Sequence, residues 1–355
     1  MSQNLKNGDS DEMEYEYKVS VLVTFYNQEA YVDETIKSII NQNVDFSYQI
    51  IIGDDGSNDG TIEKLKKWEQ RYPESIELHI NDRNGKDIVR GFRASRNRIN
   101  LLNYVKGKYF IFLDGDDFFS NEMKLQRQVD ILDKPENIDC SVCAHDIERL
   151  FPDGKSEKMV GGHIPEGKIE KNKYWLEYYF HTDTMLIRSD VIKHIDTKML
   201  ENNFNDNLIT YSIIQYGKIY YLPECMAVYR QTGDGIWTGE KEAVRAIRNM
   251  LIYDIAIKIN PDMRKETAVR VNKSWKTLFS MRKSIDIDKF HAFEVEAMEK
   301  KFKWTLHWLD YSALSIYEQV KVLLEYLYVI RVNLWREQEI KLYRIYKKLK
   351  DRVIK

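Results

Sequence analysis

Short apolar runs alternate with helical patterns through the first 113 residues, and this alternation limits the folds open to the chain. Four runs are rich in β-branched and aromatic residues and predict buried strands: residues 19–25, 48–52, 76–80 and 109–113. The segments between them, residues 30–42, 58–68 and 88–105, have apolar residues at helical spacing. Strands and helices that alternate at this spacing favour right-handed βαβ units, so we predict an α/β fold with a mostly parallel sheet flanked by helices.

Glycine and charge divide the chain near residue 240. All 16 Gly lie at or before Gly239, and the last of the six Pro is Pro261, which predicts an all-helical region beyond. Residues 1–240 carry a formal net charge of −12, whereas residues 241–355 carry +10. We therefore expect a flexible N-terminus over residues 1–17, an α/β domain over residues 18–240 and a helical, basic region over residues 241–355.

The composition is that of an ordinary globular protein, with 43% hydrophobic and 31% charged residues. Three Cys are too few for a disulfide scaffold, and the sequence has no apolar stretch long enough for a transmembrane helix or a signal peptide. We therefore expect a cytoplasmic protein. A formal net charge of −2 gives no argument for a nucleic-acid partner, and we expect none.

Polar clusters follow three of the predicted strands directly, at residues 24–27, 54–61 and 114–117. In open parallel sheets, ligands bind beyond the carboxyl ends of the strands. The third cluster places Asp114, Asp116 and Asp117 within four residues, and such carboxylates suit Mg²⁺ or Mn²⁺ when phosphate oxygens complete the shell. A turn that merely favours Asp and Gly is the alternative, but it does not explain two acidic turns at one sheet edge.

These three clusters, in this order and spacing, resemble family 2 glycosyltransferases of the GT-A fold over about residues 18–240. The resemblance implies an inverting glycosyltransferase that moves a sugar from a nucleoside diphosphate, most simply a UDP-type donor, to an acceptor hydroxyl. It also implies Mn²⁺ or Mg²⁺ as cofactor. The product would be part of a surface polysaccharide or glycolipid, with a glycan or lipid-linked acceptor.

The resemblance also assigns roles to single residues. Tyr26, Asp54 and Asp55 would hold the base and ribose of the donor. Asp114 would face the ribose and the metal, and Asp116 would ligate the metal that bridges the diphosphate. The remaining donor-binding positions implied by the resemblance are Thr24, Asn27, Arg96 and Arg230.

The general base implied by the resemblance is Asp206, which would deprotonate the acceptor hydroxyl on the face of the sugar opposite the leaving group. Asp206 also begins an apparent helix that runs through Ile213 and Ile214, so a helix cap is the structural alternative. Both roles can hold at once.

Five further residues, near the metal, the donor or the acceptor, stay open between a function and a plain structural role. Thr232 stands where the family often has histidine, which would leave the metal one fewer protein ligand. Gly233 and Gly235 suggest either a closing loop or a surface turn. His181 and Trp237 are candidates for the acceptor pocket, with a structural histidine as the alternative for His181.

The C-terminal region repeats apolar residues every three and four positions and ends among basic residues. A charged, solvated face on a packed helix explains this pattern. The functional readings are contact with anionic lipid headgroups on the inner face of the membrane, or homo-oligomerisation through the apolar face.

Two other functions compete with the glycosyltransferase hypothesis. A sugar nucleotidyltransferase needs a Gly-rich loop with a basic residue after the first strand, and residues 25–29 contain no glycine. A non-catalytic nucleotide- or glycan-binding module would have no need of Asp114, Asp116 and Asp206 together.

Overall fold

The structure, a computed structural model, describes residues 14–82, 90–160, 163–200, 206–232 and 242–281. The amino-terminal half follows the predicted alternation. Its elements are β1 (Tyr17–Phe25), α1 (Val32–Ile40), β2 (Tyr48–Asp54), α2 (Thr61–Arg71), β3 (Ile76–Ile80), α3 (Arg90–Leu101), β4 (Gly107–Asp114), β5 (Phe118–Phe119) and α4 (Lys124–Asp133). The four long predicted strands and the helices between them are therefore confirmed.

The second half mixes shorter strands with helices. Its elements are β6 (Cys140–Leu150), β7 (Ser156–Lys158), β8 (Gly167–Ile169), α5 (Lys171–Glu177), β9 (Leu186–Arg188), α6 (Thr197–Leu200), α7 (Asp206–Ile213), β10 (Lys218–Arg230), α8 (Glu242–Ile259) and α9 (Arg264–Met281). Short 3-10 helices occur at Leu102–Tyr104, Pro135–Asn137, Thr182–Thr184 (η3), Ser189–His194, Ile214–Tyr216 and Pro261–Met263.

All these strands join one sheet, with the order β3-β2-β1-β4-β9-β6-β10-β5, while β7 pairs with β6 and β8 with β10. The first four strands are parallel, and β6 is parallel to β10. The intervening β9 runs antiparallel to both β4 and β6. The α/β fold with its parallel sheet is thus confirmed, and short antiparallel strands extend the sheet beyond β4.

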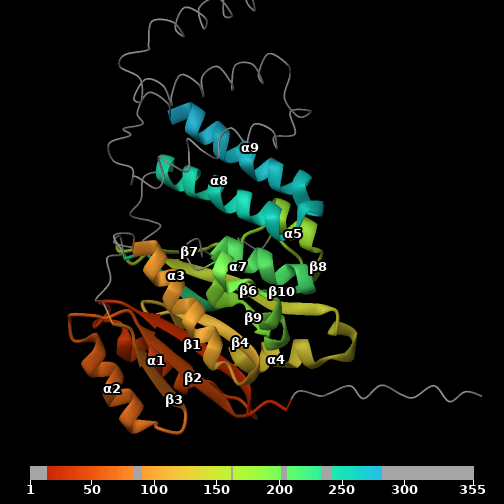
Figure 1. Cartoon of the computed structure of the whole chain (residues 1–355). Coiled ribbons are helices and arrows are strands. Elements are labelled where there is room, and N and C mark those ends of the chain that lie inside the picture. The colour runs from red at the N-terminus through yellow and green to blue at the C-terminus, as the bar shows by residue number, and fades with distance from the viewer. Residues whose placement is uncertain (1–13, 83–89, 161–162, 201–205, 233–241, 282–355) are drawn as a thin grey trace, which may run out of the picture.

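Helices cover both faces of the sheet, because alternate residues of its strands point to opposite sides. On one face, Val21 of β1 belongs to a buried cluster with Ile36 of α1 and Leu65 of α2. On the other face, Leu22 joins a cluster that takes in α3, α5, α7 and α8. Figure 1 shows α8 and α9 lying together beyond α5 and α7.

The two last described helices are attached to the sheet domain through Trp175 of α5. Its side chain is 1% exposed, and its indole N–H donates to Thr267 of α9 at 3.0 Å. Its ring also packs on Tyr211 of α7 at 4.3 Å and on Tyr253 of α8 at 5.9 Å between centroids. One hydrophobic cluster therefore includes residues on both sides of the predicted boundary near residue 240. The division into domains stays a prediction, and residues 282–355 lie outside the described part. None of the described helices is long and apolar enough to cross a membrane.

A buried polar contact fixes α4 against the sheet. Lys124 is 0% exposed, and its ammonium donates to Gln128 at 2.7 Å and lies 4.3 Å from the centre of the Phe119 ring. The amide of Gln128 donates in turn to the carbonyls of Cys143 on β6 and Thr184 of η3, at 2.6 and 2.8 Å. This contact positions η3, which carries residues of the candidate site. Burial lowers the pKa of Lys124 from 10.5 to about 7.

This depressed pKa predicts a pH-dependent stability. Between pH 7 and 9 the unfolded chain keeps the proton on Lys124 while the folded chain releases it, so the free energy of unfolding should rise with pH, by up to about 1.4 kcal/mol per unit. We expect Lys124→Met to be more stable than the wild type at pH 7 and to lose this rise. Urea unfolding at pH 7, 8 and 9 measures it, with exposed Lys134→Met as the matched control. A pH-independent difference between wild type and Lys124→Met would contradict the assignment.

Candidate functional site

The register of the central strands brings the three polar clusters to one edge of the sheet. Thr24 at the end of β1 lies opposite Gly53 of β2 on one side and Asp114 of β4 on the other. Phe25 lies opposite Asp54. Because these strands are parallel, their carboxyl ends meet, and Asp54 and Asp114 flank the end of β1. The expected common edge is therefore present.

Asp54 shapes the loop that follows β2. Its side chain is fully buried, and its oxygens accept the backbone N–H of Ser57 at 2.8 Å and the Ser57 hydroxyl at 2.6 Å. Burial raises the pKa of Asp54, and the bonds from Ser57 oppose that rise. The geometry gives Asp54 the task of holding the loop that presents Asp55.

The loop after β1 is tied to the same turn. Asn27 has a φ of 50°, a left-handed conformation that Asn tolerates better than most residues. Its N–H donates to Ser57 Oγ at 2.9 Å, and its side-chain oxygen accepts the N–H of Asn58 at 2.9 Å. These reciprocal bonds hold the loops after β1 and β2 side by side, and the half-exposed Tyr26 lies next to Asn27 in the first of them.

Arginines of α3 meet the acidic loops. Arg93 forms two hydrogen bonds to the carboxylate of Asp55, both at 3.1 Å, and Arg98 pairs with Asp114. The hydroxyl of Thr24 lies 3.4 Å from the same oxygen of Asp114. Arg96, the arginine expected to hold the donor, is half-buried on the same helix between these two. Sequence reasoning missed Arg93 and Arg98, although the signal was available: arginines recur along a helix that faces two acidic turns.

The acidic turn after β4 is held on several sides. A Cβ on Gly115 would lie 2.6 Å from Oε1 of Gln28 and would also clash with the Phe25 ring, so no larger residue fits there without a shift. The hydroxyl of Thr35 on α1 donates to the carbonyls of Gly115 and Asp117, at 3.0 and 2.7 Å.

Arg230 closes the same turn from the end of β10. Its backbone N–H donates to Asp117 Oδ1 at 2.7 Å, and its guanidinium donates to the carbonyl of Asp116 and to Glu34, the latter at 2.7 Å. The predicted donor residue Arg230 is thus present at the site. Its position beside the acidic turn allows it to offset negative charge there.

The site is electrostatically unbalanced toward negative charge. Burial and the neighbouring charge of Asp114 raise the pKa of Asp116 to about 7. Burial and the charges of Asp183 and Asp116 raise the pKa of Asp117. Carboxylates crowded in this way retain their protons unless positive charge is brought among them. A divalent cation would supply that charge.

The donor set fits such a cation. One ligand atom each from Asp114, Asp117 and His181 lies within 4.8 Å of the others. Two carboxylate oxygens and an imidazole nitrogen suit Mn²⁺ and related divalent ions. The predicted pair was Asp114 with Asp116; the structure groups Asp114 with Asp117, and Asp116 belongs to the same turn. His181, expected at the acceptor, lies with the carboxylates, directly before η3, which packs against β4.

Several predicted positions fall outside the described residues. Trp237, Gly233 and Gly235 lie in the segment 233–241, and the side chain of Asp206 is also outside, although its backbone begins α7. A hydroxyl one turn later, that of Thr210, lies 3.5 Å from Sδ of Met185, which ties α7 to the segment that carries His181.

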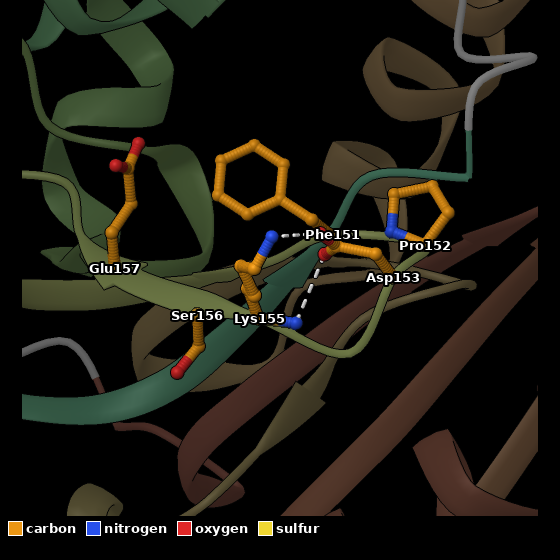
Figure 2. A pocket seen from close by; sticks show the side chains of 6 residues that line it. All are labelled: Phe151, Pro152, Asp153, Lys155, Ser156 and Glu157. Atoms are coloured by element: carbon orange, nitrogen blue, oxygen red, sulfur yellow. Dashed lines mark hydrogen bonds and ion pairs between the residues drawn. The ribbon is translucent and has the colours of Figure 1, made fainter.

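A separate hollow of about 520 Å³ lies at the turn between β6 and β7 (Figure 2). Its lining is Phe151, Pro152, Asp153, Lys155, Ser156 and Glu157. Figure 2 shows the ammonium of Lys155 directed to Asp153, at 2.7 Å. None of the acidic-turn residues lines this hollow, so the carboxylate edge remains the candidate site.

Comparison with known proteins agrees with this geometry. The family model described as glycosyl transferase family 2 matches residues 20–196. The minor teichoic acid biosynthesis protein GgaB of Bacillus subtilis is 30% identical over 234 residues, which is 63% of this chain and 24% of GgaB. Three mycobacterial proteins without an assigned function are 26% identical, and the chain spans 60% of their length.

Two solved structures share the fold. Staphylococcus aureus TarS (residues 1–349) superposes with a TM-score of 0.58 and 17% identity, over 94% of this chain and 91% of that one, and it has been solved with UDP and with UDP-GlcNAc. The mannosyltransferase PcManGT of Pyrobaculum calidifontis, solved with GDP-Man and Mn²⁺, superposes with a TM-score of 0.50 and 15% identity, over 91% of this chain and 89% of that one. With the family model, the relatives and the GT-A architecture in agreement, the chain belongs to glycosyltransferase family 2.

Proposed function

We propose that this glycosyltransferase is metal-dependent and inverting, and that it moves a sugar from a nucleoside diphosphate donor to an acceptor hydroxyl of a surface polysaccharide or glycolipid. The observation that carries the proposal is the gathering of Asp55, Asp114, Asp116 and Asp117 at one sheet edge with Arg93, Arg98 and Arg230. Alternating positive and negative groups of this kind match a ribose diphosphate with its counter-ion.

The donor would lie across the ends of β1, β2 and β4. Tyr26 offers a half-exposed ring for a base, and Asp55, held by Arg93, can accept hydrogen bonds from base or ribose. Asp114 and Asp117, with Asp116 of the same turn, would hold Mn²⁺ or Mg²⁺. When bound, the cation supplies charge that stabilises the diphosphate as it leaves. UDP and GDP-Man in the two solved structures support a nucleoside diphosphate donor of this class.

Asp206 would act as the general base. The acceptor hydroxyl gives its proton to the carboxylate, its oxygen forms the new bond to the anomeric carbon, and the bond from that carbon to the phosphate oxygen breaks. Attack opposite the leaving group inverts the anomeric configuration. Residue 206 begins α7 one turn before Thr210, the residue that contacts the His181 segment, and this placement supports the role.

The acceptor class rests on the relatives. GgaB is a minor teichoic acid biosynthesis protein, which supports an acceptor that belongs to a cell-surface polymer. Peripheral membrane contact through residues 241–355 belongs to the same proposal, because an enzyme that modifies a surface polymer works close to the membrane. Homo-oligomerisation through these residues stays a prediction.

The donor proposal predicts thermal stabilisation by nucleotide-sugars. Among UDP-, GDP-, CDP- and dTDP-sugars, we expect a UDP-type donor with Mn²⁺ to raise the melting temperature, since a ligand at about 100 times its Kd adds about 2.7 kcal/mol. Asp116→Asn should lose most of this shift, because it removes a charge from the acidic turn. Exposed Asp153→Asn removes the same charge from the β6–β7 turn, outside the acidic turn, and should keep the shift. No shift with any donor would contradict the proposal.

The general-base proposal predicts that binding and turnover separate. Asp206→Asn should keep the thermal shift with the donor but transfer sugar about 10²–10⁴-fold more slowly. UDP release measured with teichoic-acid and lipid-linked acceptors gives the rate, and NMR of the product gives the anomeric configuration. Exposed Asp190→Asn is the control with the same charge change. Wild-type rates in Asp206→Asn, or a product that retains the donor configuration, would overturn this part of the proposal.

A further inference from the structure

His181 lies deep in the site, far in sequence from the acidic turn. It precedes η3, is 5% exposed and comes within reach of Asp114 and Asp117, with ligand atoms of all three inside 4.8 Å. A histidine that merely lined an acceptor pocket would have no reason to share a centre with two carboxylates. The placement of His181 therefore indicates a role for its imidazole together with these carboxylates.

The carboxylate of Asp117 is the second observation. Its side chain is 0% exposed, Oδ1 accepts the N–H of Arg230 at 2.7 Å, and Oδ2 is buried with no hydrogen-bond donor among the described residues, its polar neighbour being the carboxylate of Asp183. A buried carboxylate oxygen left unpaired is costly, and it belongs to the residue that shares a centre with His181. A bound cation would satisfy it.

The imidazole ring is held in a fixed orientation. Asp183, fully buried, lies 3.3 Å from Nδ1 of His181, and the ring of Tyr229 stacks on it at 4.6 Å between centroids with 29° between planes. Histidines that bind metals are oriented in this way, because a carboxylate at one ring nitrogen fixes the tautomer and directs the other nitrogen to the ion. A protonated His181 paired with Asp183 alone would leave Oδ2 of Asp117 without a hydrogen-bond donor.

We propose that His181 is the nitrogen ligand of the divalent cation, that Asp114 and Asp117 are its oxygen ligands, and that Asp183 is a positioning residue that holds the imidazole. This inference rests on the proposed function and assigns its metal centre. An imidazole ligand favours Mn²⁺ over Mg²⁺, since magnesium prefers an all-oxygen shell. A proton shared between Asp117 and Asp183 is the alternative way to relieve the buried charge.

Pulsed electron paramagnetic resonance tests the ligand directly in the intact protein. With Mn²⁺ and saturating UDP, we expect a coupling from a directly bound nitrogen, and it should change when the protein carries ¹⁵N-labelled histidine, which excludes the uracil nitrogens as its source. His181→Gln should abolish the coupling and weaken Mn²⁺ binding at least about tenfold, as measured by the free Mn²⁺ signal. Exposed His194→Gln, which removes a histidine stacked on Tyr216, is the matched control and should change neither.

The outcomes separate this inference from the proposed function. Asp183→Asn should weaken Mn²⁺ binding about 10–100-fold while the nitrogen coupling remains. Bound Mn²⁺ without histidine coupling in the wild type, or unchanged Mn²⁺ affinity in His181→Gln, would overturn the assignment of His181 while donor binding stands. Unchanged affinity in Asp183→Asn would overturn its positioning role. A wild type that takes up neither UDP nor Mn²⁺ would overturn the proposed function and this inference together.

Discussion

Negative charge confined to one rim of the sheet is the constraint around which the rest of the structure is arranged. The parallel pairing of β1 with β2 and β4 places the carboxyl ends of these strands side by side, so the carboxylates at the ends of β2 and β4 lie close together. Burial makes this costly, and the raised pKa values of Asp54, Asp116 and Asp117 report that cost. Carboxylates with pKa values raised in this way cluster at functional sites.

The neighbouring elements compensate for part of this charge and fix the geometry. Arginines of α3 pair with Asp55 and Asp114, while Arg230 reaches the acidic turn from the far end of β10. The hydroxyl of Thr35 and the close packing of Gly115 hold the turn itself. Because these contacts come from different parts of the chain, the site is held in place by the protein itself, and the proposed donor would need little binding energy to order it.

Much of this could be predicted from the sequence, because the decisive signals were local. Four strands of β-branched and aromatic residues, three of them followed directly by a polar cluster, define the parallel part of the sheet and its candidate functional edge. The antiparallel strands β5 and β9 have only two and three residues and therefore carry no readable period. The grouping of Asp117 with His181, and the pairing of Arg93 with Asp55, depend on contacts between distant segments that no local pattern encodes. The side chain of Asp206 and residue Trp237 lie outside the described part of the chain, so their roles stay predictions.

Anomalous X-ray diffraction from crystals grown with Mn²⁺ and UDP tests the central claim most directly. If the crowded carboxylates exist to hold a cation against a diphosphate, a manganese peak will lie between Asp114 and Asp117, with His181 as a further ligand and the UDP phosphates beside it. UDP bound at this edge with no manganese peak, or a peak elsewhere on the molecule, would contradict the claim.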